Sequence, residues 1–230
     1  MAPRAVFLDF GGTLCHSRAD ILPFFQEAAR RASVTLPWKE YLRANEECWD
    51  ELWPQAPELV GQLPSFADRV HEMALRRIGF RGPIDTLVRY IREEAISPRS
   101  HVPFPETETV LGRLRAAGLP LHVISGHVDY LPRIIAGLGW SRYFATITFT
   151  QEVGVQKPDA RVFRYALRRA GETPAGSIHV GDSWEADYLG ASAVGMGAVW
   201  LNRTGRPAPA PCREIRSLGE LPALLADPAG

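Results

Sequence analysis

Apolar and polar positions alternate with two different periods along the chain. From about residue 17 to residue 100, apolar residues recur three or four positions apart, as on one face of an amphipathic helix. This region is predicted to contain four helices, over residues 21–29, 38–53, 66–78 and 84–96. Because it carries almost no strand signal, it is expected to fold as a small helical bundle of its own.

The rest of the chain combines short apolar runs with helical patterns. Buried strands are predicted over residues 5–8, 119–124, 145–149, 178–180 and 198–201. Helices are predicted between and after them, over residues 107–117, 130–138, 160–170, 185–194 and 218–225. Strands that alternate with helices indicate a parallel sheet covered on both faces.

These patterns predict an α/β fold in which a Rossmann-like parallel sheet, with helices on both faces, carries an inserted all-helical domain. Residues 1–16 and 101–230 are expected to form the α/β core, and residues 17–100 the helical insertion. A chain of 230 residues has room for both, since domains typically hold roughly 100–200 residues.

The balance of charges argues against nucleic-acid and membrane partners. The chain has 26 Lys plus Arg and 26 Asp plus Glu, so no basic field would attract nucleic acid or an anionic membrane. Its three cysteines, Cys15, Cys48 and Cys212, form no Cys-x-x-Cys pair, which argues against a disulfide framework or a zinc site. There is no signal-like apolar region, and no apolar run approaches the roughly 20 residues of a membrane span. We therefore expect a cytoplasmic protein without nucleic-acid or membrane partners.

Polar residues follow several of the predicted strands. Asp9 follows the first strand and precedes a pair of glycines, Ser125 follows the second strand, and Asp182 follows a later one. Because the carboxyl ends of parallel strands share one edge of the sheet, residues more than a hundred positions apart are expected to converge there. An aspartate in this setting can act as a nucleophile, as a metal ligand, or as both.

Two more polar residues are expected near this edge: Asp187, which follows Asp182 by five residues, and Lys157, in a loop before a predicted helix. Crowded carboxylates repel one another unless a cation lies among them, and an oxygen-only set of this kind suits Mg²⁺. Lys and Ser beside the carboxylates suit the oxygens of a phosphoryl group. Taken singly, each residue has an ordinary structural explanation, such as a turn or a helix cap.

Four segments carry a resemblance to a known family. They are Val-Phe-Leu-Asp-Phe-Gly-Gly-Thr-Leu at residues 6–14, His-Val-Ile-Ser at 122–125, Lys-Pro-Asp at 157–159, and His-Val-Gly-Asp-Ser-Trp-Glu-Ala-Asp at 179–187. In this order they resemble the motifs of the haloacid dehalogenase-like (HAD) superfamily, and in particular its phosphoglycolate phosphatase-like subgroup. The resemblance runs through almost the whole chain, and residues 17–100 correspond to the family's inserted helical cap.

The resemblance implies a Mg²⁺-dependent phosphohydrolase that acts on a small phosphorylated metabolite, as a monomer or a homodimer. Asp9 would attack phosphorus and form an aspartyl-phosphate, which divides a difficult hydrolysis into two easier steps. Ser125 and Lys157 would complete the catalytic set, and the cap would exclude water. The implied metal ligands are Asp9, the backbone carbonyl of Gly11, Asp182 and Asp187. The implied phosphate-binding residues are Gly12, Thr13, Ser125, Gly126 and Lys157.

One position departs from the family pattern. Phosphatases of this family place a second aspartate two residues after the nucleophile, as general acid and base, and here that position is Gly11. General acid–base catalysis is typically worth about 10²–10⁴-fold. Alkyl phosphates should therefore react slowly, whereas acyl phosphates, aryl phosphates and anhydrides have leaving groups that depart without a proton. The nearest candidates for a substitute donor are Cys15, His16 and His127.

Two other interpretations remain open. Dehalogenases of the family attack carbon with the same aspartate, use no metal, and also lack the second aspartate. They usually carry a tyrosine where this chain has Gly11, and they lack the arrangement of Asp182 and Asp187 found here. A non-catalytic binding protein that retains the fold is the other alternative. The helical region, which would determine the substrate, has Trp49 and Trp53 at the spacing of a bundle core.

Overall fold

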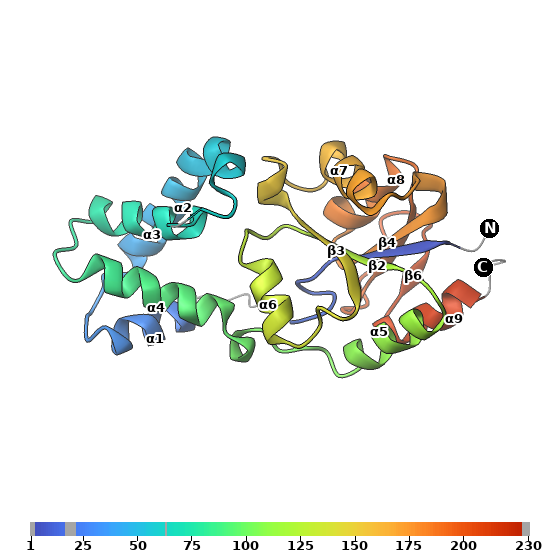
Figure 1. Cartoon of the computed structure of the whole chain (residues 1–230), viewed down its shortest axis with the longest axis horizontal. Helices are drawn as coiled ribbons and strands as arrows, with labels where there is room; N and C mark the ends of the chain where they lie inside the picture. The colour runs from blue at the N-terminus through green and yellow to red at the C-terminus, as the bar shows by residue number, and fades with distance from the viewer. Residues whose placement is uncertain (1–2, 17–21, 63, 227–230) are drawn as a thin grey trace.

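The computed structural model describes residues 3–16, 22–62 and 64–226. Within them, parallel strands form one six-stranded sheet in the order β3-β2-β1-β4-β5-β6 (Figure 1). The strands are β1 Ala5–Leu8, β2 Leu121–Ser125, β3 Phe144–Phe149, β4 Ser177–Gly181, β5 Gly197–Leu201 and β6 Glu214–Ile215. The predicted parallel α/β sheet is thus confirmed.

The alternation of side chains along β1 explains why helices cover both faces of the sheet. Val6 and Leu8 point into one hydrophobic core, and Ala5 and Phe7 point into the other, so that all four side chains are buried. The first core lies against α5 (Thr107–Ala116) and α9 (Leu221–Ala226), and the second against α7 (Ala160–Ala170) and α8 (Gly190–Ser192) (Figure 1). The remaining helix of this part, α6 (Leu131–Gly137), contacts β3.

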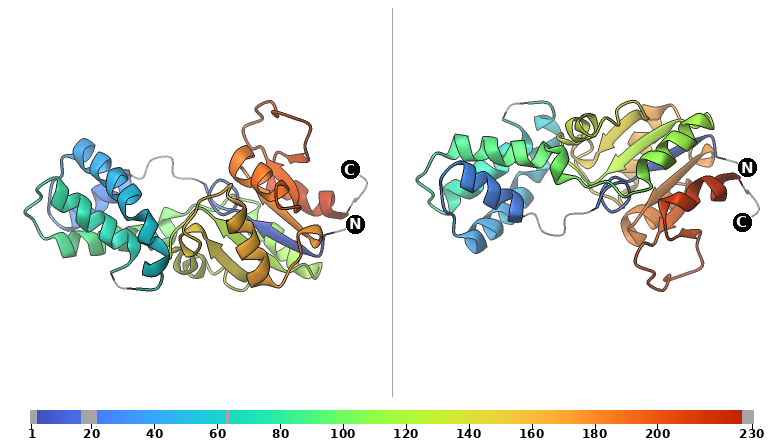
Figure 2. Two further views of the ribbon diagram at one scale, coloured as in Figure 1. Left: turned by 90° about the horizontal axis from the view of Figure 1, so that it is seen from above. Right: turned by 90° about the horizontal axis from the view of Figure 1, so that it is seen from below.

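Residues 22–96 form a separate helical unit, which lies beyond the carboxyl edge of the sheet and far from both ends of the chain (Figures 1 and 2). Its helices are α1 Leu22–Arg31, α2 Trp38–Leu52, α3 Phe66–Arg77 and α4 Ile84–Ile96, with a 3-10 turn over Trp53–Leu59. Helix α1 packs along α4, and α2 along α3. The predicted start of the first helix, Ile21, lies outside the described residues. No helix in the described ranges has the length and apolar character needed to span a membrane.

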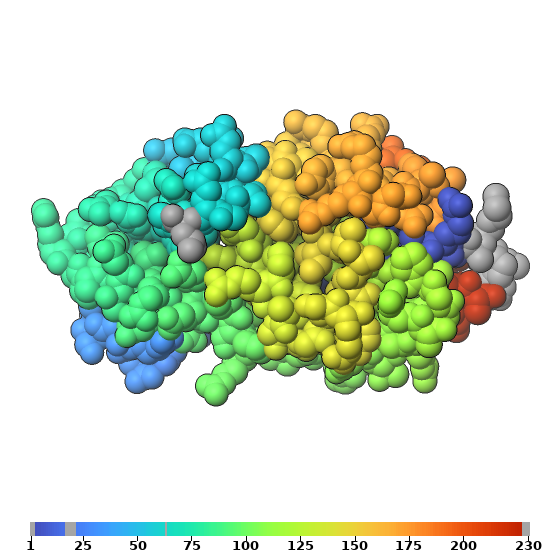
Figure 3. All heavy atoms as spheres, viewed as in Figure 1, coloured from blue at the N-terminus to red at the C-terminus, as the bar shows by residue number. Residues whose placement is uncertain are grey.

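The helical unit packs directly against the α/β part of the chain (Figure 3). At one point Gln151, a fully buried residue just after β3, donates from Nε2 to the carbonyl oxygen of Ala56 at 3.0 Å. At a second point the hydroxyl of Tyr130, which precedes α6, donates to Asp68 Oδ1 in α3 at 2.9 Å. These hydrogen bonds join the helical unit to the α/β part of the chain at two places.

Asp68 joins three elements through one buried carboxylate. At the start of α3, Asp68 accepts the backbone N–H of Ser65 while its own N–H donates to the Ser65 hydroxyl, which is a capping box. The same carboxylate accepts from Tyr130 and, at 2.6 Å, from Arg92 in α4. Because the side chain is only 1% exposed, each of these donors replaces water that the carboxylate has lost.

The structure differs from the prediction in two elements. Strand β6 lies where no strand was predicted, since its two residues carry no apolar run. Residues 185–194 were predicted as one helix, but a widened π turn over Trp184–Leu189 comes first and only Gly190–Ser192 is α-helical. The N–H groups of Asp187 and Tyr188 both donate to the carbonyl oxygen of Ser183, which widens the turn.

Replacement of Asp68 tests whether its carboxylate joins the two parts of the chain. Asp68→Ala leaves Arg92 and Tyr130 without their buried acceptor, so we expect it to lower the free energy of unfolding by about 3–5 kcal/mol. Glu72→Ala, on the same helix, removes only an exposed pair with Arg76 and should cost about 0–1 kcal/mol. Urea denaturation followed by tryptophan fluorescence measures both values. Equal losses would contradict the assigned role.

Candidate active site

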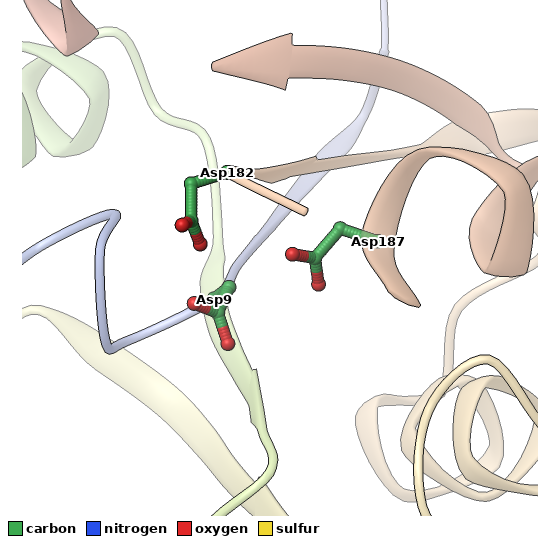
Figure 4. A group of neighbouring side chains, drawn as sticks. All are labelled: Asp9, Asp182 and Asp187. Atoms are coloured by element: carbon green, nitrogen blue, oxygen red, sulfur yellow. The ribbon is translucent and has the colours of Figure 1, made fainter. Parts of the chain in front are cut away.

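The site lies where the order of the strands reverses. The chain passes from β1 to β2 and β3 on one side and then places β4 on the other side of β1. In open α/β sheets, ligands bind outside the carboxyl ends of the strands at such a reversal. Asp9 directly follows β1 and Asp182 directly follows β4. Figure 4 shows the carboxylates of both converging with that of Asp187, and one oxygen from each lies within 4.8 Å of the others.

A buried ammonium group holds two of these carboxylates. Lys157 Nζ donates to Asp9 Oδ1 at 2.7 Å and to Asp187 Oδ1 at 2.5 Å. Its third hydrogen bond goes to the backbone carbonyl of Ile124 at 3.2 Å. The three charged side chains are between 2% and 8% exposed, so each depends on the others to remain charged away from water.

Asp187 serves to position Lys157. Its Oδ1 also accepts from Nε2 of His179, in β4, at 2.9 Å, and its Oδ2 accepts the backbone N–H of Ser183 at 3.1 Å. The π turn that precedes α8 brings this carboxylate back toward the strand edge. Gly181 provides the space, because a Cβ there would lie 2.2 Å from the Asp187 carboxyl carbon. His179 was not singled out from the sequence, where it reads as one more residue of a buried strand.

Burial and charge set the protonation of these groups. Burial raises the pKa of Asp9 to about 6 against the lowering effect of Lys157, and Asp187 adds to the rise. Burial also raises the pKa of Asp182, again with a contribution from Asp187. Burial opposes the charge of Asp187 as well, but Lys157 and His179 hold its pKa well below the ordinary range. Lys157 and Asp187 therefore stay charged as an ion pair. Asp9 and Asp182, whose pKa values are raised, would be stabilised in their charged forms by an additional cation.

The donor set fits a divalent cation. Three carboxylates and one ammonium leave an excess of negative charge, and Lys157 occupies only one oxygen of Asp9. No side chain in the described part of the protein donates a hydrogen bond to the Asp182 carboxylate. Carboxylate oxygens are among the ligands that Mg²⁺ prefers. Both oxygens of Asp187 already accept hydrogen bonds. Asp9 and Asp182 are thus the two side chains with oxygens available for such an ion.

Gly12 leaves room for the Asp182 carboxylate. Its φ of +77° lies in the left-handed region that glycine favours, and a Cβ there would lie 2.4 Å from Asp182 Oδ2. The N–H of Gly12 donates to the carbonyl oxygen of Cys15 at 2.7 Å, so it is already used within the loop. Thr13 is fully buried, and its hydroxyl finds no partner among the described residues.

Ser125 and Gly126 lie at the same edge of the sheet. Ser125 ends β2, and the register that pairs Leu8 with Val123 brings it beside the residues that follow β1. Its side chain is buried, and within the described ranges its hydroxyl makes no hydrogen bond that would fix it elsewhere. Ser125, Lys157, Asp9, Asp182 and Asp187 are therefore gathered as the sequence predicts.

Arg203, which lies two residues beyond the end of β5, was missed from the sequence. Its Nε donates to the carbonyl oxygen of Gly12 at 3.1 Å, and its Nη2 to that of Thr13 at 2.9 Å. The guanidinium also lies 3.4 Å from the centre of the Phe104 ring and pairs with Glu106 at 2.7 Å. Arg203 thereby fixes the backbone of the loop that carries Asp9.

The three substitute donors proposed from the sequence occupy different surroundings. Cys15 is fully buried, and burial raises its pKa to about 12. His127 accepts the N–H of Val128 on its Nδ1 at 3.0 Å, and burial, with His101 nearby, lowers its pKa to about 4. The ring of His16 lies against Phe104, with centroids 4.0 Å apart. Neither Cys15 nor His127 is suited to deliver a proton at neutral pH.

A parallel sheet with a buried lysine–carboxylate site at its strand reversal is typical of an α/β protein that binds its ligand at that edge. The family model of haloacid dehalogenase-like hydrolases matches residues 3–195. The chain belongs to the haloacid dehalogenase-like hydrolase family. It is 31% identical to a phosphoserine phosphatase of Thermus thermophilus, over 89% of this chain and 83% of the relative. It is 29% identical to a glyceraldehyde 3-phosphate phosphatase of Methanothermobacter thermautotrophicus, over 86% of this chain and 85% of the relative.

Solved structures place the fold in the same family. The chain superimposes on a 2-haloacid dehalogenase from Pseudomonas syringae with a TM-score of 0.75 and 26% sequence identity. The alignment covers 97% of this chain and 98% of the other. The phosphatases and the dehalogenase together identify the chain as a hydrolase of this family with relatives of both chemistries.

Alanine substitutions at Gly12 and at a control glycine test whether the space beside Asp182 matters for cation binding. We expect Gly12→Ala to displace the Asp182 carboxylate and weaken Mg²⁺ binding by about 10–100-fold, as the loss of a supporting contact typically does. Gly61→Ala is the matched control, because Gly61 has a φ of +72° and no atom within 4 Å of its Cβ position. Both variants suffer about 1–3 kcal/mol of backbone strain. Isothermal titration calorimetry with Mg²⁺ separates them, and equal affinities would rule out the assigned role of Gly12.

Proposed function

We propose that the protein is a Mg²⁺-dependent phosphohydrolase that acts on a small phosphorylated metabolite through an aspartyl-phosphate on Asp9. The observation that carries the proposal is the buried contact of 2.7 Å between Lys157 and Asp9, beside a second carboxylate with oxygens to spare. The phosphatase names of relatives over most of the chain support the same chemistry. A dianionic phosphate needs positive charge at the site, and Lys157 with a divalent cation would supply it.

Each side chain has a distinct part in this proposal. One carboxylate oxygen of Asp9 attacks phosphorus, while the ammonium of Lys157 keeps Asp9 ionised and neutralises charge on the phosphoryl group. Ser125 donates its hydroxyl to a phosphoryl oxygen. Gly126 and the residues after Asp9, including Gly12 and Thr13, shape the rest of the phosphate site. Asp187 keeps Lys157 in place through its own ion pair.

Mg²⁺ would be held by Asp9, Asp182 and the backbone carbonyl of Gly11, with Asp187 next to it. When bound, the ion would supply positive charge, which stabilises the negative phosphoryl group and the ionised form of Asp9. The raised pKa of both Asp9 and Asp182 means that neither carboxylate is fully compensated by the protein alone. A bound cation would compensate the remaining negative charge of the two carboxylates.

Residues 17–100 would act as the cap, and residues 1–16 with 101–230 as the catalytic core. The helical unit reaches the site region, since its side chains and Gly11 line one cavity of about 440 Å³. Closure of such a unit over the substrate excludes water until the aspartyl-phosphate has formed.

The nucleophile and the metal are tested together with acetyl phosphate. We expect Mg²⁺-dependent release of phosphate that EDTA abolishes and Asp9→Asn lowers by at least about 10³-fold, since no nucleophile remains. Asp85→Asn, an exposed aspartate of α4, is the control and should keep full activity. Phosphate release that survives EDTA would contradict the proposal.

Dehalogenation is the second candidate, because a dehalogenase superimposes on the chain with a TM-score of 0.75. It requires halide release from haloacids, dependent on Asp9 and independent of Mg²⁺. Halide release without phosphatase activity would replace the first proposal with this one. A protein inert toward both classes of substrate would point to a binding role.

The absence of a side chain at Gly11 has its own test. Gly11→Asp restores a carboxylic acid at the position of the family's proton donor, so turnover of an alkyl phosphate such as phosphoserine should rise by about 10²-fold or more. Gly11→Asn has the same shape and no acidic proton, and it should give no rise. Steady-state kcat/KM values for the two variants decide the question. No difference between them would mean that protonation of the leaving group does not limit the reaction.

A further inference from the structure

A cavity of about 440 Å³ lies between the helical unit and the edge of the sheet. Gly11 lines it beside the nucleophile, and Phe25, Trp49 and Ile91 line it from α1, α2 and α4. Trp49 packs edge-on against Phe66 as part of the bundle, as its spacing predicts, and it also faces this cavity. The volume lies within the roughly 300–1,000 Å³ typical of sites for small organic ligands. A phosphate ester that reacts at the edge of the sheet can therefore extend its organic part into this cavity.

Asn45 in α2 and His71 in α3 line this cavity and contact each other. Asn45 Nδ2 lies 2.9 Å from His71 Nδ1, and the hydroxyl oxygen of Tyr41 lies 3.0 Å from the same nitrogen. Because an amide nitrogen only donates, Nδ1 is the acceptor, and a neutral ring then carries its proton on Nε2. Within the described residues, Nε2 has no hydrogen-bond partner. Its N–H is therefore the hydrogen-bonding group that the ring offers to the cavity.

Burial keeps the ring of His71 neutral. The residue is only 8% exposed, and burial lowers its pKa to about 4, against the raising effect of Asp68. At neutral pH, Nε2 is thus a donor without a charge. A buried N–H that has lost water and gained no partner is costly, so an oxygen atom of a ligand that accepts from it would bind favourably.

The two sides of the cavity differ in their access to charge. Among the described residues, the lining that the helical unit contributes holds no Lys, Arg, Asp or Glu, so a charged group beside His71 would lose water and gain no counter-charge. His16 lines the cavity from the loop after the nucleophile, near Gly11, since Cys15 pairs with Gly11. His16 is exposed, so a proton or a charge on its ring lies in contact with water at the reacting end.

We propose that His71 determines substrate specificity by donating from Nε2 to an uncharged hydroxyl or carbonyl oxygen on the organic part of the phosphate ester. This role rests on the proposed phosphohydrolase function and adds a substrate class to it. The organic part is mostly hydrocarbon, which suits Phe25, Trp49 and Ile91, and it carries one such oxygen away from the phosphate. Because that oxygen takes no part in bond breaking, the contact is made equally in the ground state and the transition state. It therefore lowers KM and leaves kcat unchanged.

Three substrates of the Mg²⁺-loaded full chain test this class. The compounds meta-(hydroxymethyl)phenyl phosphate and meta-ethylphenyl phosphate have nearly the same size and leaving group, and they differ in one oxygen atom. We expect kcat/KM to be about 2–10-fold higher for the hydroxymethyl compound, mainly through KM, as one neutral hydrogen bond provides. For meta-carboxyphenyl phosphate it should be at least about tenfold lower than for the hydroxymethyl compound. Equal values for the hydroxymethyl and ethyl compounds, or a preference for the carboxylate, would overturn the inference.

Two variants of His71 assign the preference to Nε2. His71→Asn keeps an acceptor oxygen for its neighbours in the bundle and has no N–H at the position of Nε2, so it should abolish the preference for the hydroxymethyl compound by raising its KM. His71→Gln, whose amide nitrogen reaches about as far as Nε2, should restore part of it. His101→Asn is the matched control and should leave the preference unchanged, because His101 Nε2 lies 2.8 Å from the carbonyl oxygen of Ala95. A preference that persists in His71→Asn would overturn the role of His71.

Acetyl phosphate separates a failure of this inference from a failure of the proposed function. If the wild-type protein hydrolyses acetyl phosphate through Asp9 and shows no preference between the hydroxymethyl and ethyl compounds, only the role of His71 is rejected. The same holds if it hydrolyses acetyl phosphate and neither aryl phosphate. Absence of Asp9-dependent hydrolysis of acetyl phosphate would reject the proposed function itself.

Discussion

The ion pair of Lys157 with Asp9 and Asp187 is the interaction on which the site depends. Two carboxylates enclosed at a strand edge would repel each other and take up protons, and one ammonium 2.7 Å and 2.5 Å from them prevents this. Asp187 and His179 fix the ammonium, which in turn presents Asp9 in its charged form. The π turn brings the Asp187 carboxylate back toward the strands, and Gly181 leaves the space for it.

The remaining constraints follow from the loop after β1. It must bring Asp9 and Asp182 together, so it turns at Gly12, where any side chain would meet the second carboxylate. Arg203, just beyond β5, donates hydrogen bonds to two carbonyl oxygens of the loop. On its other side the loop leaves Gly11 open to the cavity under the helical unit. One short loop therefore carries the candidate nucleophile, contacts the candidate cation site and lines the cavity.

Much of this could be predicted from the sequence, because periodicity and strand ends are local properties. The strands around Asp9, Ser125 and Asp182 follow from apolar runs that end in polar residues, and the helical region follows from its spacing. Arg203 was missed because its partners, Gly12 and Thr13, lie far along the chain. His179 was missed because its place in a buried strand gives no sign of its contact with Asp187. Strand β6 has too few residues to form a pattern, and the π turn arises from one shared carbonyl acceptor. The cavity is formed by two parts of the chain packed together, so no single segment predicts it.

The central claim is that Asp9 becomes phosphorylated during turnover. Rapid acid quench of the Mg²⁺-loaded protein during reaction with acetyl phosphate, followed by peptide mass spectrometry, tests it most directly. The account predicts a phosphoryl group on the peptide that contains Asp9, absent from Asp9→Asn. Substrate consumption with no phosphoryl group on Asp9, or with the group on another residue, would contradict it.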